Sequence, residues 1–341
     1  MHARIQAVPM RRRVLIGTGV AVLLASAYGL SRRRSPPLEG TSTVRIATPL
    51  VPHAGLVHLA SARGLFKKQG LEVALLPQTH GKAALADLLQ GKADLAVAAD
   101  VPVVVEVLKG APLSIVASIA TASNELAVLG RIDRGIRASD DLRGRKVGVT
   151  LGTSGEYFLW AFLTRYRIAP RAIQFVDLPP SQLVESLRNG AVDAVAAWQP
   201  VRHEAEQAFE NEVVSLHAPD AYAQRFVLVG ARDYVQTHQQ ELHRLLRALI
   251  DAETFARLEP QQAKGVLAER IKLAPGTLEP SWQDMTFEVE QQQAQLVTLE
   301  DVATWAMARG YAPVQRMPNF LSHLALDALL AIGPERVTVV R

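Results

Sequence analysis

The chain has 341 residues, of which 49% are hydrophobic and 21% are charged, a composition that excludes general disorder and allows two lobes of roughly 100 to 150 residues each. The formal net charge of +4 arises in the first 40 residues, which hold seven arginines and one acidic residue, whereas the rest of the chain has 30 basic and 32 acidic residues. The excess of positive charge therefore belongs to the leader and gives no reason to expect nucleic-acid binding, which requires a basic face. The absence of cysteine excludes disulfides, thiolate metal sites and a lipid-bearing N-terminal cysteine.

Residues 1–30 have the pattern of an export signal. A basic start precedes an apolar run from Val14 to Leu30, with the small residues Ala25-Ser26-Ala27 as a possible cleavage site, and "RRRVLIG" loosely resembles a twin-arginine signal. An uncleaved membrane anchor is the alternative, since the run is barely long enough to span a bilayer and arginines follow it. Both readings predict a periplasmic or extracytoplasmic protein, with residues 31–43 as a Pro-rich linker.

Beyond the linker, strand-like and helix-like segments alternate, which predicts an α/β fold with largely parallel sheets. The segment at 91–102, "GKADLAVAADVP", is repeated about 100 residues later at 190–200 as "GAVDAVAAWQP". Each copy has a glycine, an aspartate three residues later, and an apolar strand that ends in Val-Ala-Ala before a proline. This repeat predicts two similar lobes.

The segments before these copies also correspond. Residues 44–55, "VRIATPLVPHAG", and 146–155, "KVGVTLGTSG", each read as strand, loop and helix start, and each precedes a second strand that ends in Leu-Pro. In open α/β sheets, ligands bind outside the carboxyl ends of strands. The loops after Thr48, Ala99, Thr150 and Ala197 therefore form one candidate cleft between the lobes. Farther along, helical patterns at about 236–258 and 260–270 predict helices packed on a lobe.

At this point the chain resembles the periplasmic solute-binding proteins of ABC importers for nitrate, taurine, alkanesulfonates and thiamine-precursor pyrimidines. The resemblance rests on the order and spacing of "GLFKKQGLEVAL", "LLQGKADLAVAA", "DLRGRKVGVTLGTSGEYFL" and "LRNGAVDAVAAWQP". It implies a two-lobed type II binding-protein fold with the ligand cleft between two similar open sheets. It also implies an N-terminal part of the first lobe at 44–128, a second lobe at 129–230, and a return to the first lobe with C-terminal helices at 231–341.

The first candidate site is the helix start in "LGTSGEYFLW". Unpaired N–H groups and partial positive charge at a helix start could hold a sulfonate, carboxylate or phosphate near Gly152, Thr153, Ser154 and Gly155. Thr153 and Glu156 also fit a capping box, so Glu156 could be a cap, a ligand contact or each in turn. A catalytic serine elbow needs a glycine where Glu156 stands, and Ser154 is therefore not predicted to be a nucleophile.

Strand ends supply the other candidates. Trp198, followed by Gln199, offers an apolar wall, a face for a cationic group and one N–H donor, or it lies in the core. Asp100 could bind ligand or cap the next helix; if it and Glu156 both face the ligand, an amine-bearing compound is favoured. Thr48 and His53 lie in the first loop after a strand, where His53 could contact an anion or a ring, or remain solvated.

These features predict a solute-binding protein that captures a small organic ligand, such as a sulfonate or a taurine-like compound, and delivers it to an ABC importer permease. We expect no catalytic residues, metal or cofactor, no nucleic-acid partner, a monomer, and membrane contact only through the leader or the permease. The alternatives are a cofactorless enzyme and a membrane-tethered sensory subunit that use the same cleft. The cysteine-rich motif of the related eukaryotic pyrimidine synthases is absent, which argues against that enzyme.

Overall fold

The computed structural model describes residues 43–274, 276–312 and 316–340. The predicted leader at 1–30, and the predicted linker up to residue 42, lie outside the described residues. Among the helices that are described, none is both long and apolar enough to cross a bilayer.

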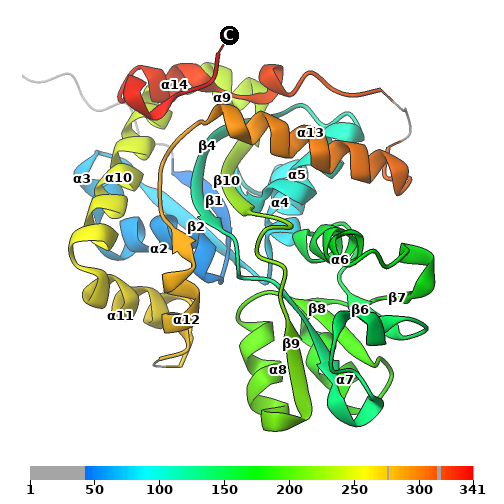
Figure 1. The fold of residues 1–341 in the computed structure, drawn as a ribbon. Helices are drawn as coiled ribbons and strands as arrows, with labels where there is room; N and C mark the ends of the chain where they lie inside the picture. The colour runs from blue at the N-terminus through cyan, green and yellow to red at the C-terminus, as the bar shows by residue number, and fades with distance from the viewer. Residues whose placement is uncertain (1–42, 275, 313–315, 341) are drawn as a thin grey trace, which may run out of the picture. The chain divides into compact units, whose positions relative to one another are not determined.

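One sheet has six strands in the order β11-β4-β10-β3-β1-β2 (Figure 1). Strands β2, β1 and β3 run parallel, and β10 runs antiparallel to both β3 and β4. We call this sheet with its helices the first lobe. Its strands are β1 (Val44–Pro49), β2 (Val73–Gln78), β3 (Leu95–Ala99), β4 (Leu113–Ala122), β10 (Gln224–Ala231) and β11 (Met285–Thr286).

The other sheet has five strands in the order β7-β6-β8-β5-β9. Strands β7, β6 and β8 run parallel, and β5 runs antiparallel to β8 and β9. We call this sheet with its helices the second lobe. Its strands are β5 (Ala127–Arg131), β6 (Lys146–Val149), β7 (Gln174–Asp177), β8 (Ala194–Ala197) and β9 (Val213–Leu216).

The two strand orders correspond position by position, with β2-β1-β3-β10-β4 in the first lobe and β7-β6-β8-β5-β9 in the second. The internal repeat predicted from the sequence is confirmed. The expectation of largely parallel sheets was wrong in one respect, because each sheet is mixed. The strand that runs antiparallel to the three parallel ones in each sheet, β10 or β5, is the one that the chain forms directly after it crosses from the other lobe, and the short β11 is also antiparallel, to β4.

The helices pack on these sheets (Figure 1). The predicted helical stretch at 236–258 is divided at His238 into two helices, and Leu242, Leu245, Leu246 and Leu249 of the second are fully buried. Three helices belong to the second lobe, namely α6 (Ser154–Arg165), α7 (Pro180–Arg188) and α8 (Val201–Phe209). Those of the first lobe are α2 (Gly55–Ala62), α3 (Leu65–Lys68), α4 (Gly81–Leu89), α5 (Asp100–Leu108), α9 (Arg232–Thr237), α10 (Gln239–Leu258), α11 (Pro260–Arg270), α12 (Leu278–Gln283), α13 (Gln293–Ala308) and α14 (Leu326–Leu330).

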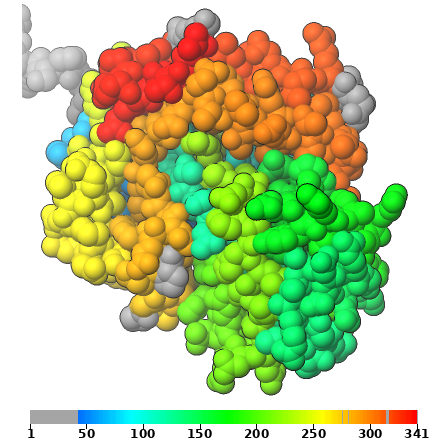
Figure 2. All heavy atoms as spheres, viewed as in Figure 1, coloured from blue at the N-terminus to red at the C-terminus, as the bar shows by residue number. Residues whose placement is uncertain are grey.

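Two stretches join the lobes, residues 123–126 between β4 and β5 and residues 217–223 between β9 and β10. These changes of sheet come a few residues before the lobe boundaries inferred at 128 and 230. Strands β3 and β8, which lead into the region between the lobes, are buried along their whole length, as expected for strands covered on both faces. The space-filling view shows the green second lobe against the orange C-terminal segment (Figure 2).

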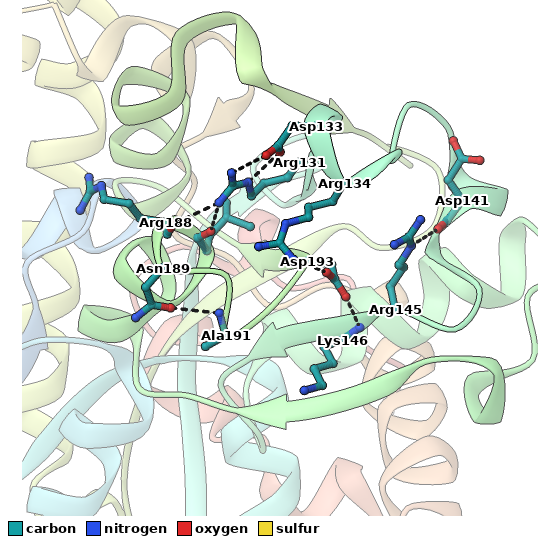
Figure 3. Close-up of polar contacts among 11 residues, drawn as sticks. Arg131, Asp133, Arg134, Asp141, Arg145, Lys146, Arg188, Asn189, Ala191 and Asp193 are labelled. Atoms are coloured by element: carbon teal, nitrogen blue, oxygen red, sulfur yellow. Dashed lines mark hydrogen bonds and ion pairs between the residues drawn. The ribbon is translucent and has the colours of Figure 1, made fainter.

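The aspartates of the repeat have the same structural task in both lobes. Asp94 accepts a hydrogen bond from the backbone N–H of Arg45 at 2.8 Å, and Asp193 accepts one from the N–H of Lys146 at 2.9 Å. Figure 3 shows Asp193 between Lys146 and Arg134, whose Nη1 lies 3.9 Å from its carboxylate. Each aspartate therefore fixes the start of the neighbouring strand, at the end of the sheet opposite the carboxyl ends of the parallel strands.

Candidate functional site

A small cavity lies between the lobes, at the carboxyl ends of the parallel strands. Its volume is about 20 Å³, enough for a water molecule or two. An organic ligand would therefore require the lobes to separate. The first lobe contributes Val51, His80, Gly81, Lys82, Ala99, Pro102, Gln224 and Phe226, and the second contributes Thr153, Ser154 and Trp198.

The starts of two helices from different lobes meet at this cavity. At the start of α4, the N–H groups of Ala83 and Ala84 donate to the carbonyl of His80, and those of Gly81 and Lys82 have no partner among the described residues. Facing them is the start of α6, where the N–H of Ser154 is likewise unpaired within the described part of the chain. Unpaired N–H groups and the helix dipole favour an anion at such a position.

Lys82 adds a full positive charge between the two helix starts. Its Nζ donates a hydrogen bond to the carbonyl of Leu151 at 2.8 Å, across the gap between the lobes. It also lies beside Gly152, where a Cβ would come within 3.2 Å of Nζ. Gly152 has a φ of +70°, which a side chain would strain, and its lack of a Cβ leaves room for the ammonium group.

Aromatic rings also line the cavity. Trp198 follows β8 and packs closely on the start of α6, since a Cβ at Gly155 would lie 3.0 Å from Cζ3 of the indole. Phe226 of β10 lines the cavity from the first lobe and stacks on His53 with ring centroids 4.7 Å apart. The lining of the cavity therefore combines hydrogen-bond donors with an aromatic, apolar surface.

Of the residues predicted from the sequence, Thr153, Ser154 and Trp198 line the cavity, and Gly152 and Gly155 lie beside it. The hydroxyl oxygen of Ser154 accepts a hydrogen bond from Nε2 of Gln224 at 2.6 Å, again between the lobes. Gln199 is placed differently. It is buried, and its Oε1 accepts from the N–H of His203 at 3.0 Å, so it stabilises the start of α8 and does not line the cavity.

Glu156 does not line the cavity either, and its carboxylate is already occupied. Oε2 accepts from the N–H of Gly152 at 2.7 Å, while Oε1 accepts from Nη2 of Arg309 at 2.7 Å and Nε at 3.0 Å. Thr153 is the N-cap residue and accepts from the N–H of Gly155. Thr153 is the cap residue as predicted, but the capping box itself is not formed, because the Thr153 hydroxyl accepts from Gly155 and not from the N–H of Glu156. Glu156 reaches the N–H one residue before the cap, because Gly152 turns that group toward the carboxylate.

Asp100 is the first residue of α5, and its side chain turns into the protein. Oδ1 accepts from the N–H of Val101 and from the hydroxyl of Tyr222. Burial raises its pKa to about 6, against the smaller opposing effect of the Tyr222 hydrogen bond. Asp100 does not line the cavity and is not the helix cap, because Ala99 occupies the cap position.

Thr48 and His53 are also fully buried, and neither lines the cavity. Burial lowers the pKa of His53 to about 3, so the imidazole is neutral and not the solvated side chain of the alternative prediction. Its Nδ1 lies 3.8 Å from Oε1 of Glu125, a residue not considered in the sequence analysis. Both ring nitrogens, like Oγ1 of Thr48, lack a hydrogen-bond partner in the described part of the protein.

Some of the lining residues that sequence reasoning missed follow the strand-end rule that identified the others, and some do not. His80, Gly81 and Lys82 come directly after β2, in the stretch "LLPQTHGK", so the carboxyl end of that strand was a signal for them. Gln224 and Phe226 lie on β10, and only the return of the chain to the first lobe brings them to the cavity.

Several known proteins with a similar sequence are described as binding proteins, and one from Haemophilus influenzae, 27% identical over 220 residues, is described as a thiamine biosynthesis protein. A curated Brucella abortus (strain 2308) protein described as a binding protein is 22% identical over 224 residues, covering 65% of this chain and 69% of that protein. The taurine-binding periplasmic protein of Escherichia coli (strain K12) is 26% identical over 168 residues, 48% of each chain.

Solved structures share the fold at lower identity. The alkanesulfonate-binding protein SsuA from Xanthomonas axonopodis pv. citri, solved with bound MOPS, has a TM-score of 0.72 at 19% identity, over 83% of this chain and 97% of that one. The desulfurization enzyme DSZB has a TM-score of 0.66 at 15% identity, over 86% of this chain and 99% of that one. The expected two-lobed fold of periplasmic binding proteins is confirmed, and the same fold also occurs in an enzyme.

A sequence profile described as NMT1/THI5 like matches residues 51–263, more than half of the chain. Together with the matching lobes and the cavity between them, this match establishes that the chain belongs to the NMT1/THI5-like family.

Proposed function

We propose that this protein is an extracytoplasmic solute-binding protein that captures a small organic anion, such as a sulfonate or a taurine-like compound, and delivers it to an ABC importer. The observation that carries the proposal is the meeting of the α4 and α6 starts with Lys82 at one cavity between the lobes. The names of the curated relatives agree with this role.

The geometry favours an anionic end on the ligand. The donors are the N–H groups of Gly81, Lys82 and Ser154 together with the Lys82 ammonium group, and no carboxylate lines the cavity. The conditional preference for an amine-bearing ligand, which depended on Asp100 and Glu156 facing it, therefore loses its basis. The rings of Trp198 and Phe226 suit an apolar or planar body.

Binding would follow from closure of the lobes. A ligand that contacts α4 on one lobe and α6 on the other gains all of its interactions only when the lobes come together, so it shifts the population toward the closed form. The contact of Lys82 with Leu151 shows that the lobes can approach to hydrogen-bond distance at this point. The closed form would then be the one that a permease recognises.

Binding without chemistry is the reading that the surroundings of Ser154 support. Its oxygen accepts a hydrogen bond from the amide of Gln224, and an amide N–H cannot act as the base that a nucleophilic serine needs. The alternative is an enzyme in the same cleft, which the similarity to the desulfurization enzyme favours. The same proposal includes three further points. The protein is an extracytoplasmic monomer, its leader is either cleaved or retained as an anchor, and its partner is the permease.

The test uses the chain from Thr43 onward, which forms one compact unit. Its thermal unfolding is measured with alkanesulfonates, taurine, nitrate and pyrimidines, and any compound that raises the midpoint is examined by calorimetry and by mass spectrometry after prolonged incubation. We expect tight binding of an organic sulfonate that is recovered unchanged. No shift with any compound would contradict the proposal, and a chemically altered compound would support the enzyme.

A further inference from the structure

Two residues of the first lobe hold the carboxylate of Glu156, which belongs to the second. Arg309 and Tyr311 follow α13, a helix that packs on α5 of the first lobe. Arg309 donates two hydrogen bonds to Oε1 of Glu156, at 2.7 and 3.0 Å, and the hydroxyl of Tyr311 donates to Oε2. The Glu156 side chain is fully buried, and that of Arg309 is one-third exposed. Figure 2 shows the orange C-terminal segment against the green second lobe.

Glu156 presents an electrostatic difficulty for a site that binds anions. It is the third residue of α6, two positions after Ser154, which lines the cavity. A negative charge in the first turn of this helix would repel an anion bound at the helix start, because charge repulsion is only partly screened in a protein interior. The carboxylate nevertheless has a structural task, because it holds the N–H of Gly152.

Arg309 supplies the compensating charge. Its guanidinium contacts the carboxylate through two nitrogens, and it also lies over the ring of Phe175 in β7, with the carbon of the guanidinium 4.9 Å from the ring centroid. An arginine held both by a carboxylate and by an aromatic face has a defined position. The net charge of the Glu156–Arg309 pair is therefore close to zero. The start of α6 keeps the positive potential that attracts an anion.

We propose that Arg309 is a positioning residue that makes the cleft selective for anions by neutralising Glu156, although Arg309 itself does not line the cavity. The inference rests on the proposed function, since it presupposes an anionic ligand at the α6 start. A purely structural role, in which Arg309 only fastens the two lobes together, predicts a different response to substitution.

The test compares Arg309→Met, Glu156→Gln and the double variant, with ethanesulfonate as the probe and calorimetry as the measurement. Arg309→Met leaves a buried charge beside the ligand, and we expect affinity to fall between about tenfold and about a hundredfold. In the double variant the charge is gone, while the glutamine oxygen can still accept from Gly152, so affinity should return to within about threefold of wild type. If Arg309 only fastens the lobes, the double variant remains as weak as Arg309→Met.

Arg336→Met is the matched control. Arg336 forms a comparable partly buried ion pair with Glu253 at 2.8 Å, in the first lobe and away from the cavity, so its loss should lower stability and leave affinity unchanged. Circular dichroism shows whether each variant is folded. Equal affinities of wild type and Arg309→Met, or no recovery in the double variant, would overturn this inference but leave the proposed function standing. If no compound of the thermal-unfolding screen, ethanesulfonate included, binds the wild-type protein, both this inference and the proposed function are contradicted.

Discussion

Glu125 and His53 form a buried pair at the point where the chain leaves the first lobe, with Oε1 of the carboxyl 3.8 Å from Nδ1 of the imidazole. Burial shifts the two groups in opposite directions, raising the pKa of Glu125 to about 8 and lowering that of His53 to about 3. For Glu125, Arg202 works against this shift and Asp284 adds to it. Near pH 7 the pair is therefore two neutral groups and not an ion pair.

The stability of the protein should depend on pH through this pair. Unfolded, Glu125 has an ordinary pKa of 4.5, so between about pH 4.5 and 8 the folded state holds a proton that the unfolded state lacks, and stability falls as pH rises. His53 has the opposite effect between about pH 3 and 6.5, where the unfolded state holds the extra proton. Only the Glu125 effect remains from pH 6.5 to 8, with a slope of at most about 1.4 kcal/mol per pH unit.

Glu125→Gln isolates this effect, because the amide has a similar shape and does not titrate. Urea unfolding at several pH values between 6.5 and 8.5 should show that the free energy of unfolding decreases less steeply for the variant than for wild type. Parallel curves for the two proteins would show that Glu125 does not titrate in this range.

Lys82→Met should weaken the binding of an anionic ligand by about fivefold, the effect of removing one partly exposed charge from beside the site. The affinity of the variant should also depend less on ionic strength than that of wild type. Calorimetry at two salt concentrations measures both effects. Lys92→Met is the control, because Lys92 lies beyond the other end of α4 with a mostly exposed side chain. An equal loss of affinity in both variants would show that the overall charge of the protein, and not the position of Lys82, determines the effect.

Trp198→Ala removes the largest ring that lines the cavity. We expect affinity for the ligand to fall at least about tenfold, since a large aromatic surface is lost from the site. Trp282→Ala, which removes an indole packed on Phe287 in the first lobe, should leave affinity within about twofold of wild type. Calorimetric titration of both variants with the same ligand compares the two affinities. Unchanged affinity in Trp198→Ala would show that the ligand does not bind against this ring.

Gly81→Ala should destabilise the protein by about 1 to 3 kcal/mol, because the new Cβ would lie 2.8 Å from the Cα of Ala98 in β3. Gly265→Ala, in α11, meets nothing within 4 Å and should stabilise the protein by about 0.5 to 1 kcal/mol, as alanine does in an exposed helix. Chemical unfolding of the two variants checks both signs. A stabilised Gly81→Ala would mean that α4 can move away from β3 without cost.

The sequence predicted the fold better than the site because repeats and strand ends report the path of the backbone. The two copies of Val-Ala-Ala identified corresponding strands, and "GTSGE" predicted a capped helix start at the cleft. Side-chain direction is a different matter. Asp100 stands at a strand end as predicted, yet it turns inward to Tyr222, a partner 122 positions along the chain.

Glu156 shows the same limit more clearly. Its local pattern predicted the cap, but nothing within that pattern could reveal Arg309, which lies 153 positions away. Contacts of this kind depend on how the lobes meet. Burial has a similar origin, since the depth of His53 and Glu125 results from packing between the first lobe and the connecting stretch and not from the residues next to them.

The cross-strand pairing of Ala122 with Gln224 has a consequence for how the two lobes are arranged along the chain. All five strands of the second lobe come from one continuous stretch, which leaves the first lobe at one strand of an antiparallel pair and returns on its neighbour. The second lobe is thus an insertion at the tip of a β-hairpin. Removing residues 123–223 and closing the hairpin with a short Asn-Gly turn would leave the first sheet with every one of its strands.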